Sequence, residues 1–515
     1  MRSADDRTGV AGRATSVLAG IASILVLMWP ALVNGGPFYF SDTSSYVRAG
    51  DVAARMVFGP GARTIWTRES DSGSAVSPST PAGSPPAASA ATGQAGLVQA
   101  RGNEPERGYI MSGRSPFFGV ILWLSWVASR FWLFILVQAV CAYVLIVLGL
   151  RAFGYDRPGV RLGVAAALSV LTPLAIYDGV LLADGLSGFG IAAFLLLGSP
   201  TARLSRLETI FLILLLIVSI ISHLTHLVMV ASMTAVLAFC LWRGWVDRVA
   251  ARRGIAVGVA TTLIGVVSVM ATSFTVERHY GRPPVLVPLI TARFVADGPG
   301  RDFIASGCGG RDFAVCKIRQ NGWTSSTDFL WSRDRAIGGF LTESVETRRL
   351  MSEQDKAFAL AVAKAYPIRT ALFAVWNTLL QIGDVRSQIL TGRCFARPAC
   401  VGDQFPPEIV QTTARTLSGQ GLWPMRAANV VIYAAAVGAI AVLAVLLPGL
   451  RRRDPAMARQ LALWVALVVV AMLVNGFLGG AISEPQSRYQ ARMAWLIPFL
   501  AALALLRWRA IRRPA

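Results

Sequence analysis

The chain has 515 residues, of which 54% are hydrophobic and only 15% are charged, and its formal net charge is +21 at pH 7. This composition excludes a soluble globular protein with a polar surface and is typical of a polytopic membrane protein. The positive charge gives no reason to expect a nucleic acid partner, because the arginines follow the order of the predicted membrane spans.

Apolar runs along the chain predict its spans. A helix needs about 20 apolar residues to cross hydrocarbon that is about 30 Å thick. The sequence therefore predicts an all-α polytopic membrane protein with about ten transmembrane helices, at 15–34, 131–151, 162–177, 180–198, 207–221, 224–242, 255–275, 427–448, 460–480 and 491–507. A cleaved signal peptide is the competing interpretation of the first run. No small-x-small cleavage site follows Trp29-Pro30-Ala31, so we interpret it as an anchor.

The arginines predict the orientation of these spans, because Lys and Arg are enriched in short cytoplasmic loops. Arginines precede the first span and then follow every second one, for example Arg151, Arg203, Arg248 and Arg451. We therefore predict an inner (plasma) membrane protein with both termini cytoplasmic. Two large segments, 35–130 and 276–426, would lie on the outer side, and a site there would face the periplasm or exterior.

The chain then divides into five regions. The first outer loop contains an acidic motif, a Ser/Ala/Gly/Pro-rich stretch at 70–107 that is typical of a disordered insertion, and a juxtamembrane helix. The second outer segment has globular character and an amphipathic stretch at 352–366, which we expect to lie on the membrane or to pack on the outer domain. The predicted regions are the N-terminus and first span (1–34), the first outer loop (35–130), a transmembrane core (131–275), an outer-face domain (276–426) and the C-terminal spans with a basic tail (427–515).

Four of the six cysteines lie in the second outer segment as two close pairs, Cys308 with Cys316 and Cys394 with Cys400. Disulfides are permitted on that side of the membrane. A metal site built from the four thiols is the alternative, but neither spacing is a CxxC. We therefore favour two disulfides.

Charged residues gather at the predicted outer rim. Asp42 follows the first span directly, in an aromatic segment, where a carboxylate is costly to desolvate and a functional role is expected. Other charged or titratable side chains are expected on the same side, namely Asp51, Asp178, Asp184, His223, His226, Arg278, His279, Glu484, Arg488 and Arg492.

Four motifs in this order resemble the GT-C superfamily, polytopic glycosyltransferases that use polyprenyl-phosphate-linked sugars as donors. Phe40–Tyr46 (FSDTSSY) looks like the acidic motif of the first outer loop, and Gly113–Gly119 (GRSPFFG) looks like the start of the juxtamembrane helix. Leu171–Asp184 is similar to the turn with a second acid. Ser487–Arg492 (SRYQAR) looks like the arginine-tyrosine element. The resemblance covers 15–275 and, locally, 480–507; the segment 276–426 has no counterpart in it.

The resemblance implies an inverting transfer at the outer face. Asp42 would be the general base that takes a proton from an acceptor hydroxyl. Asp184 would orient the acceptor or bind Mg²⁺ or Mn²⁺, although the family often has two adjacent acids and here the next acid after Asp42 is Asp51, nine residues on. The substrate and phosphate would be bound by Arg488, Arg492, Tyr489, Arg278, Arg114 and Tyr46. The implied partners are the lipid donor, a glycan, lipid or protein acceptor, and the bilayer.

Structural roles are the alternative for each of these residues. Asp42 would then cap a juxtamembrane helix, Asp184 would pair with an arginine between two spans, and Arg488 and Arg492 would extend to headgroups. The histidines of the chain, His223, His226 and His279, would form a metal site or hydrogen-bonded turns. We favour the turns, because no adjacent carboxylate completes a ligand set.

Three other function classes stay open. A transporter needs charges or helix breaks near the midplane and often has paired halves, whereas the charges here lie at the rim. A polysaccharide polymerase or ligase would share the outer arginines and the lipid substrates, but would depend less on an early aspartate. A non-catalytic sensor or assembly factor would tolerate the loss of Asp42.

Overall fold

The fold is helical throughout the part of the chain that the structure describes. The computed structural model describes residues 3–67, 109–318, 322–395 and 405–512. Within these ranges there is no β-strand, and isolated bridges join Phe38 to Val180 and Met111 to Val285. The all-α prediction is thereby confirmed for these residues, whereas the predicted insertion at 70–107 lies outside them.

Seven of the described helices, some of them continued by a neighbouring one, are long and apolar enough to cross a membrane. They coincide with seven of the ten predicted spans, which confirms a polytopic membrane protein. They are the apolar part of α1 (Ser3–Asn34), α5 (Trp132–Ala152), α10 (Leu224–Trp242), α11 (Arg248–Tyr280), α19 (Met425–Arg453), α20 (Pro455–Gly476) with the π-helical turn η7 (Phe477–Ile482), and α21 (Ser487–Ala494) with α22 (Leu496–Arg512).

The three remaining predicted spans, 162–177, 180–198 and 207–221, form shorter helices. Their helices are α6 (Pro158–Leu171), α7 (Leu174–Asp178), η3 (Ala183–Gly185), α8 (Leu186–Leu197) and α9 (Arg206–Ser222). Pro173 ends α6, because a proline disfavours helical geometry in the residue before it. The chain then turns at Gly179–Leu182 before α8 begins. Ten full spans therefore stay a prediction, and this break places Asp184.

Two helices near the first span pack with their backbones in contact. They are α2 (Ser41–Phe58), which the short turn η1 (Pro60–Ala62) follows, and α4 (Pro116–Ser129). A Cβ atom on Gly50 of α2 would lie 2.1 Å from the carbonyl oxygen of Gly119 on α4. The buried Asp51 carboxylate of α2 also joins these segments. It accepts hydrogen bonds from the Thr64 N–H, which follows η1, and from the Trp123 Nε1–H of α4, both at 3.0 Å.

A second hydrophobic core, separate from that of the bundle, contains Tyr109 and residues from Val285 to Val362. We call residues 109–111, 285–318 and 322–366 the cap. Its helical segments are α12 (Leu289–Asp297), α13 (Pro299–Ala305), η4 (Cys308–Gly310), η5 (Ala314–Cys316), α14 (Ser326–Trp331), η6 (Phe340–Thr342) and α15 (Val345–Ala365). The amphipathic stretch 352–366 lies within α15 and buries Phe358 and Val362 in this core. It therefore packs on the cap.

The cap is smaller than the outer domain expected at 276–426. After α15 the chain forms α16 (Pro367–Gly383), α17 (Gly392–Phe395) and α18 (Pro407–Ala414). The chain then contributes to the core of the bundle through Val385, Ile389, Phe405, Ile409 and Trp423. The Cys308–Cys316 disulfide is present, as predicted. Cys400 lies outside the described residues, so the second disulfide stays a prediction.

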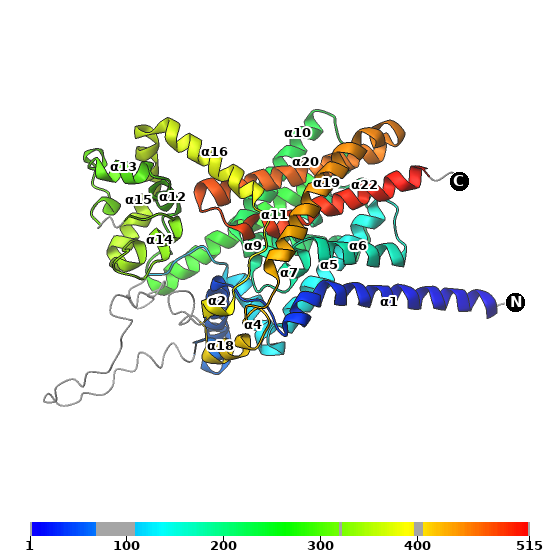
Figure 1. Ribbon diagram of the computed structural model, residues 1–515, viewed down its shortest axis with the longest axis horizontal. Helices are drawn as coiled ribbons and strands as arrows, with labels where there is room; N and C mark the ends of the chain where they lie inside the picture. Colours follow the sequence, from blue (N-terminus) through cyan, green and yellow to red (C-terminus); the bar gives the residue numbers. More distant parts are fainter. Residues whose placement is uncertain (1–2, 68–108, 319–321, 396–404, 513–515) are drawn as a thin grey trace.

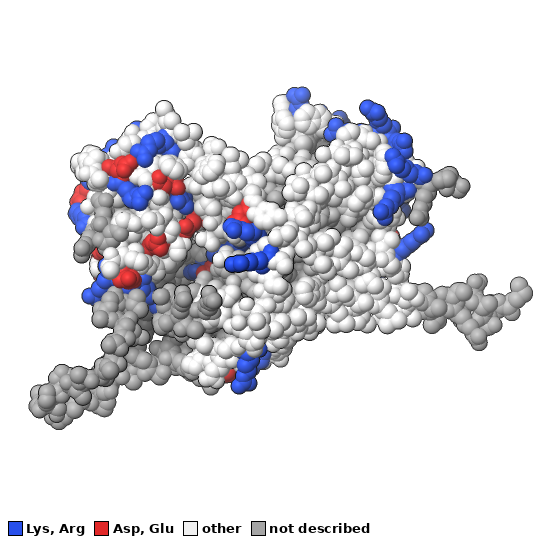
Figure 2. Space-filling view, in the orientation of Figure 1, with Lys and Arg blue, Asp and Glu red and all other residues white. Residues whose placement is uncertain are grey.

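The charged residues separate along the length of the molecule. Both termini lie at one end, far from the cap (Figure 1). Lys and Arg gather at the end with the termini, and both signs mix over the cap (Figure 2). Between them lies a broad surface without charged side chains, apart from small groups next to the cap and at the lower edge of the view. At the basic end, Arg151 pairs with Glu208, Arg253 donates to the Leu197 carbonyl, and Arg507 pairs with Asp454.

Because α2 and α4 are in backbone contact, alanine substitutions at two glycines should differ sharply in their effect on stability. Gly50→Ala forces a methyl group into the backbone of α4 and is expected to lower the free energy of unfolding by about 1–3 kcal/mol, despite the higher helix propensity of alanine. Gly61→Ala is the matched control, because nothing lies within 4 Å of its Cβ position. Thermal unfolding in detergent measures both. Equal melting temperatures for the two variants would contradict the packing.

Candidate active site

The start of α2 is attached to the loop that precedes Asp184. The Phe38 N–H donates to the Gly179 carbonyl at 2.8 Å, and the Leu181 N–H donates to the Phe38 carbonyl at 3.0 Å. The Thr43 hydroxyl adds a third link, since it donates to the Leu181 carbonyl at 3.0 Å. Two of the predicted motifs, far apart in the sequence, thus lie side by side.

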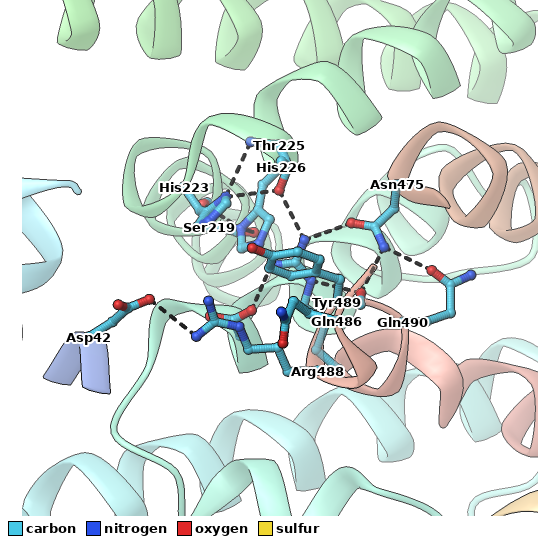
Figure 3. Close-up of polar contacts among 12 residues, drawn as sticks. Asp42, Ser219, His223, Thr225, His226, Asn475, Gln486, Arg488, Tyr489 and Gln490 are labelled. Atoms are coloured by element: carbon cyan, nitrogen blue, oxygen red, sulfur yellow. Dashed lines mark hydrogen bonds and ion pairs between the residues drawn. The ribbon is translucent and has the colours of Figure 1, made fainter. Parts of the chain in front are cut away.

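Asp42 lies between two arginines from different segments. Its Oδ1 forms an ion pair with Arg114, just before α4, and its Oδ2 lies 3.1 Å from Nη1 of Arg488 on α21. Figure 3 shows Asp42 pointing from α2 toward Arg488. The Asp42 side chain is 21% exposed, so the cluster is accessible from one side. The capping role belongs to Thr43, whose hydroxyl accepts from the Phe40 N–H at 3.0 Å.

The arginines also control the protonation of Asp42. Burial alone would raise the pKa of its carboxyl group. The positive charges of Arg114 and Arg488, and the hydrogen bonds that they donate, outweigh burial and hold the pKa of Asp42 below its ordinary value. Asp42 is therefore a carboxylate at neutral pH, with both oxygens engaged.

Both arginines keep donors that the protein does not use. The Nε atoms of Arg114 and Arg488 are buried and have no hydrogen-bond partner among the described residues. The Arg488 guanidinium lies 4.4 Å from the ring centre of Phe40, and that of Arg114 lies 5.9 Å from the ring centre of Trp331 in the cap. A buried, unpaired N–H is costly, so these groups favour an added acceptor such as a phosphate oxygen.

Arg492, one helical turn after Arg488, is wholly buried, and each of its three side-chain nitrogens donates a hydrogen bond. Its Nη1 donates to Asp184 at 2.9 Å, and its Nη2 donates to Asn475 at 2.7 Å and to the Thr225 hydroxyl at 3.0 Å. Its Nε donates to the Tyr489 carbonyl at 3.1 Å. This geometry matches the structural alternative for Asp184, in which it pairs with an arginine between spans.

The helix break before α21 brings Arg488 to Asp42. The turn η7 ends α20, and the chain crosses 483–486 before α21 begins. Gln381 of α16 holds this crossing, because its amide donates to the Gln486 carbonyl at 3.0 Å and accepts from the Gln486 N–H at 2.7 Å. Sequence reasoning missed Gln381 and Asn475. An amide within an apolar run was the available signal for Asn475.

His223 and His226 are hydrogen-bonded at the start of α10, as favoured from the sequence, whereas for His279 the turn stays a prediction. His223 Nδ1 lies 2.8 Å from the Thr225 hydroxyl, and His226 Nδ1 lies 2.9 Å from the Ser219 carbonyl oxygen. In the described part of the chain, no three His, Cys, Asp or Glu side chains lie close enough together to share a metal ion. Asp42 and Asp184 each face arginines, so this pair does not fit a common Mg²⁺ or Mn²⁺ site.

The remaining predicted site residues differ in placement. Tyr489 lies beside both arginines of α21. Tyr46 is buried with its ring edge-on to Phe118, which is a packing role. Arg278 is exposed near the end of α11 and makes no ion pair with the residues that the structure describes. Glu484 accepts a hydrogen bond from the Thr327 N–H at 2.9 Å and thus ties the crossing to the cap.

Comparisons with protein-family models, with curated proteins and with solved structures find no match for this chain. Function is therefore argued from two features of the site. One is the accessible cluster of Asp42, Arg114 and Arg488, and the other is the buried pair of Asp184 and Arg492.

Breaking the buried pair on one side is expected to be costly. Arg492→Met leaves the Asp184 carboxylate buried without its cation and should destabilise the fold by about 3–5 kcal/mol. Arg492→Met combined with Asp184→Leu should recover most of that loss. Arg369→Met is the control, since its pair with Asp302 is half exposed and should contribute at most about 1 kcal/mol. The pairing is contradicted if the two single variants unfold alike.

Asp42 predicts a stability difference that depends on pH. The ion pairs lower the pKa of Asp42 in the folded protein. The stabilisation that they give is therefore complete above the pKa of Asp42 in the unfolded chain, about 3.9, and is lost as the pH falls toward its pKa in the folded protein. The wild type should therefore exceed Asp42→Asn in stability by a constant amount from about pH 5 upward, and this excess should shrink below about pH 4. Melting temperatures of both proteins across this range measure it. An excess that stays constant into acid would argue against the ion pairs.

Proposed function

We propose that this protein is a membrane glycosyltransferase that moves a sugar from a polyprenyl-phosphate donor to a glycan, lipid or protein acceptor, with inversion. The supporting observation is the cluster at Asp42, where one carboxylate and two arginines with unused donors meet at an accessible point. The order of motifs that resembles the GT-C superfamily supports the same proposal. The donor and the acceptor are both parts of this proposal.

The orientation of the proposed site follows from charge. The bilayer is the partner of the apolar belt between the two charged ends. We infer that the end with the termini is cytoplasmic, because arginine-rich loops stay on that side. The cap and the Asp42 cluster then face the periplasm or exterior of an inner membrane, where lipid-linked sugars would reach the site from the outer leaflet.

The donor phosphate would take the place of Asp42 on the arginines. The phosphodiester of the donor carries one negative charge, and a second develops when the sugar leaves. Arg114 and Arg488 would bind its oxygens with the donors that now hold Asp42 and with their unused Nε–H groups. They would bind the leaving phosphate more strongly than the donor, which is the requirement for catalysis.

The same exchange would prepare Asp42 as the base. When the phosphate neutralises the arginines, the pKa of Asp42 is expected to rise toward its ordinary value. The acceptor oxygen then attacks the anomeric carbon, Asp42 takes the hydroxyl proton, and the bond from carbon to phosphate oxygen breaks with its electron pair on the phosphate. Carboxylates act as general bases in inverting glycosidases too.

Asp184 and Arg492 would act as positioning residues. Their pair is buried and holds α21 against the loop at 179–185, so neither side chain needs to touch the substrate. Arg492 would therefore orient Arg488 rather than bind the phosphate itself. In this proposal Asp184 likewise has no role as a ligand of Mg²⁺ or Mn²⁺.

Transport is the second candidate, and the helix breaks favour it. Asp184 lies in η3, and Arg492 lies in the short helix α21 that follows the interruption after η7; transporters place such breaks at their binding sites. A transporter should keep its turnover in Asp42→Asn as long as the buried pair is intact. A polymerase or ligase would depend on Arg114 and Arg488 more than on Asp42.

The test uses membranes that contain the protein and radiolabelled polyprenyl-phosphate sugars. Asp42→Asn removes the proton acceptor at nearly constant shape and should lower sugar transfer by about 100-fold or more. Asp312→Asn, at an exposed carboxylate of the cap, is the control and should transfer normally. Folded protein is matched by gel filtration before each assay.

Three results separate the alternatives. Loss of transfer in Asp42→Asn, with normal transfer in Asp312→Asn, supports the proposal. Near-normal transfer in Asp42→Asn, with loss in Arg488→Gln, would favour a polymerase or ligase. If the wild type consumes no donor across a broad panel, the glycosyltransferase proposal is wrong and transport or assembly becomes the better hypothesis.

A further inference from the structure

The helix α16 leaves the cap at a sharp angle and carries an exposed apolar face. It follows α15 after Tyr366 and is bent by 113° from it. Its exposed apolar residues recur at positions that share one side of a helix. They are Ile368, Leu372, Val375, Trp376, Leu379 and Leu380, between 45% and 74% exposed.

The other side of α16 is polar and firmly held. The Asn377 amide donates to the Asp297 carboxylate of the cap at 2.9 Å, and Gln381 makes two hydrogen bonds to the backbone of Gln486. Thr370, Asn377 and Gln381 are all buried. These contacts determine which way the helix faces, so its apolar side is turned outward in the folded protein.

The surroundings of this face indicate hydrocarbon. The backbone of α16 touches that of η7, because a Cβ on Gly480 would lie 2.2 Å from the Asn377 carbonyl oxygen. Exposed apolar residues continue onto the neighbouring segments, with Leu473 on α20 and Phe477 on η7. In Figure 2 a small group of charged side chains lies between the cap and the bundle, and the surface of the bundle beyond this group is largely free of charge. The face therefore continues the apolar belt of the spans.

Arginines lie at both ends of α16. Arg369 is in its first turn and pairs with Asp302, while Arg386 follows its last turn and pairs with Asp384. Helices that lie in a membrane interface combine an apolar face with cationic side chains that reach the headgroups. With 17 residues α16 is shorter than the length of about 20 that a full span needs, so this arrangement fits the surface of a lipid leaflet.

We propose that α16 is an interfacial helix whose apolar face is embedded in the lipid leaflet on the side of the cap. Its Gln381 then holds the crossing before α21, and with it Arg488, at the depth of the lipid headgroups. The occupant of the face is the hydrocarbon of the leaflet. This inference does not depend on sugar transfer and would hold for any reaction at the site.

Spin labels can measure the depth of this face. Leu372→Cys on α16 and Leu360→Cys on α15 have similar exposure, 64% and 57%, and each would be labelled in a protein that also carries Cys141→Ala and Cys240→Ala. The labelled proteins are reconstituted into phosphatidylcholine vesicles. Collisions of each label with oxygen, which dissolves in hydrocarbon, and with a water-soluble nickel chelate are then compared.

At position 372 the label should meet oxygen several-fold more often than the chelate, and at position 360 the preference should reverse. Equal access of the chelate to both labels would overturn the proposal. Protection of position 372 from both reagents would overturn it as well, because another protein surface would then cover the face. Leu379→Cys gives a second position on the same face if the first variant does not fold.

Discussion

A buried guanidinium among apolar helices restricts the arrangement of everything that contacts it. Arg492 is 1% exposed, and its donors go to Asp184, Asn475, Thr225 and the Tyr489 carbonyl. Removing any one acceptor would leave a desolvated N–H, so the four groups must stay in place together. They come from η3, α20, α10 and α21 itself. One cation thus joins segments that are up to 308 residues apart.

Arg488 takes its position from that anchor. It lies one turn before Arg492 on α21, and Gln381 fixes the backbone just ahead of it. The two arginines have similar sequence surroundings but different environments, because Arg492 is enclosed while Arg488 is 13% exposed and faces a carboxylate with an open side. The Arg492–Asp184 pair is buried and fixed, whereas the Arg488–Asp42 pair is accessible. A substrate that exchanges partners with the accessible pair then meets a site whose geometry the buried pair maintains.

The sequence was most informative at charged residues that stand beside apolar runs or within short motifs. Asp42, Arg114 and Arg488 were each singled out by their position at the end of an apolar run or in a short motif, and the structure brings them together. Asp51 was not separable from Asp42 by sequence, although it is fully enclosed by Thr64 and Trp123. Full spans at 162–198 were expected because hydropathy does not register the turn that Pro173 and Gly179 introduce.

Helix α16 is a second element that the sequence prediction did not identify. Its apolar face has the period of a helix, but polar residues interrupt it, and the sequence prediction placed it in the outer segment at 276–426. Those residues are the ones that attach it to the cap and to Gln486. Arg114 lies against Trp331 of the cap, whereas Arg488 follows the crossing that α16 holds. Both cations beside Asp42 therefore depend on parts of the chain that lie outside the ten predicted spans.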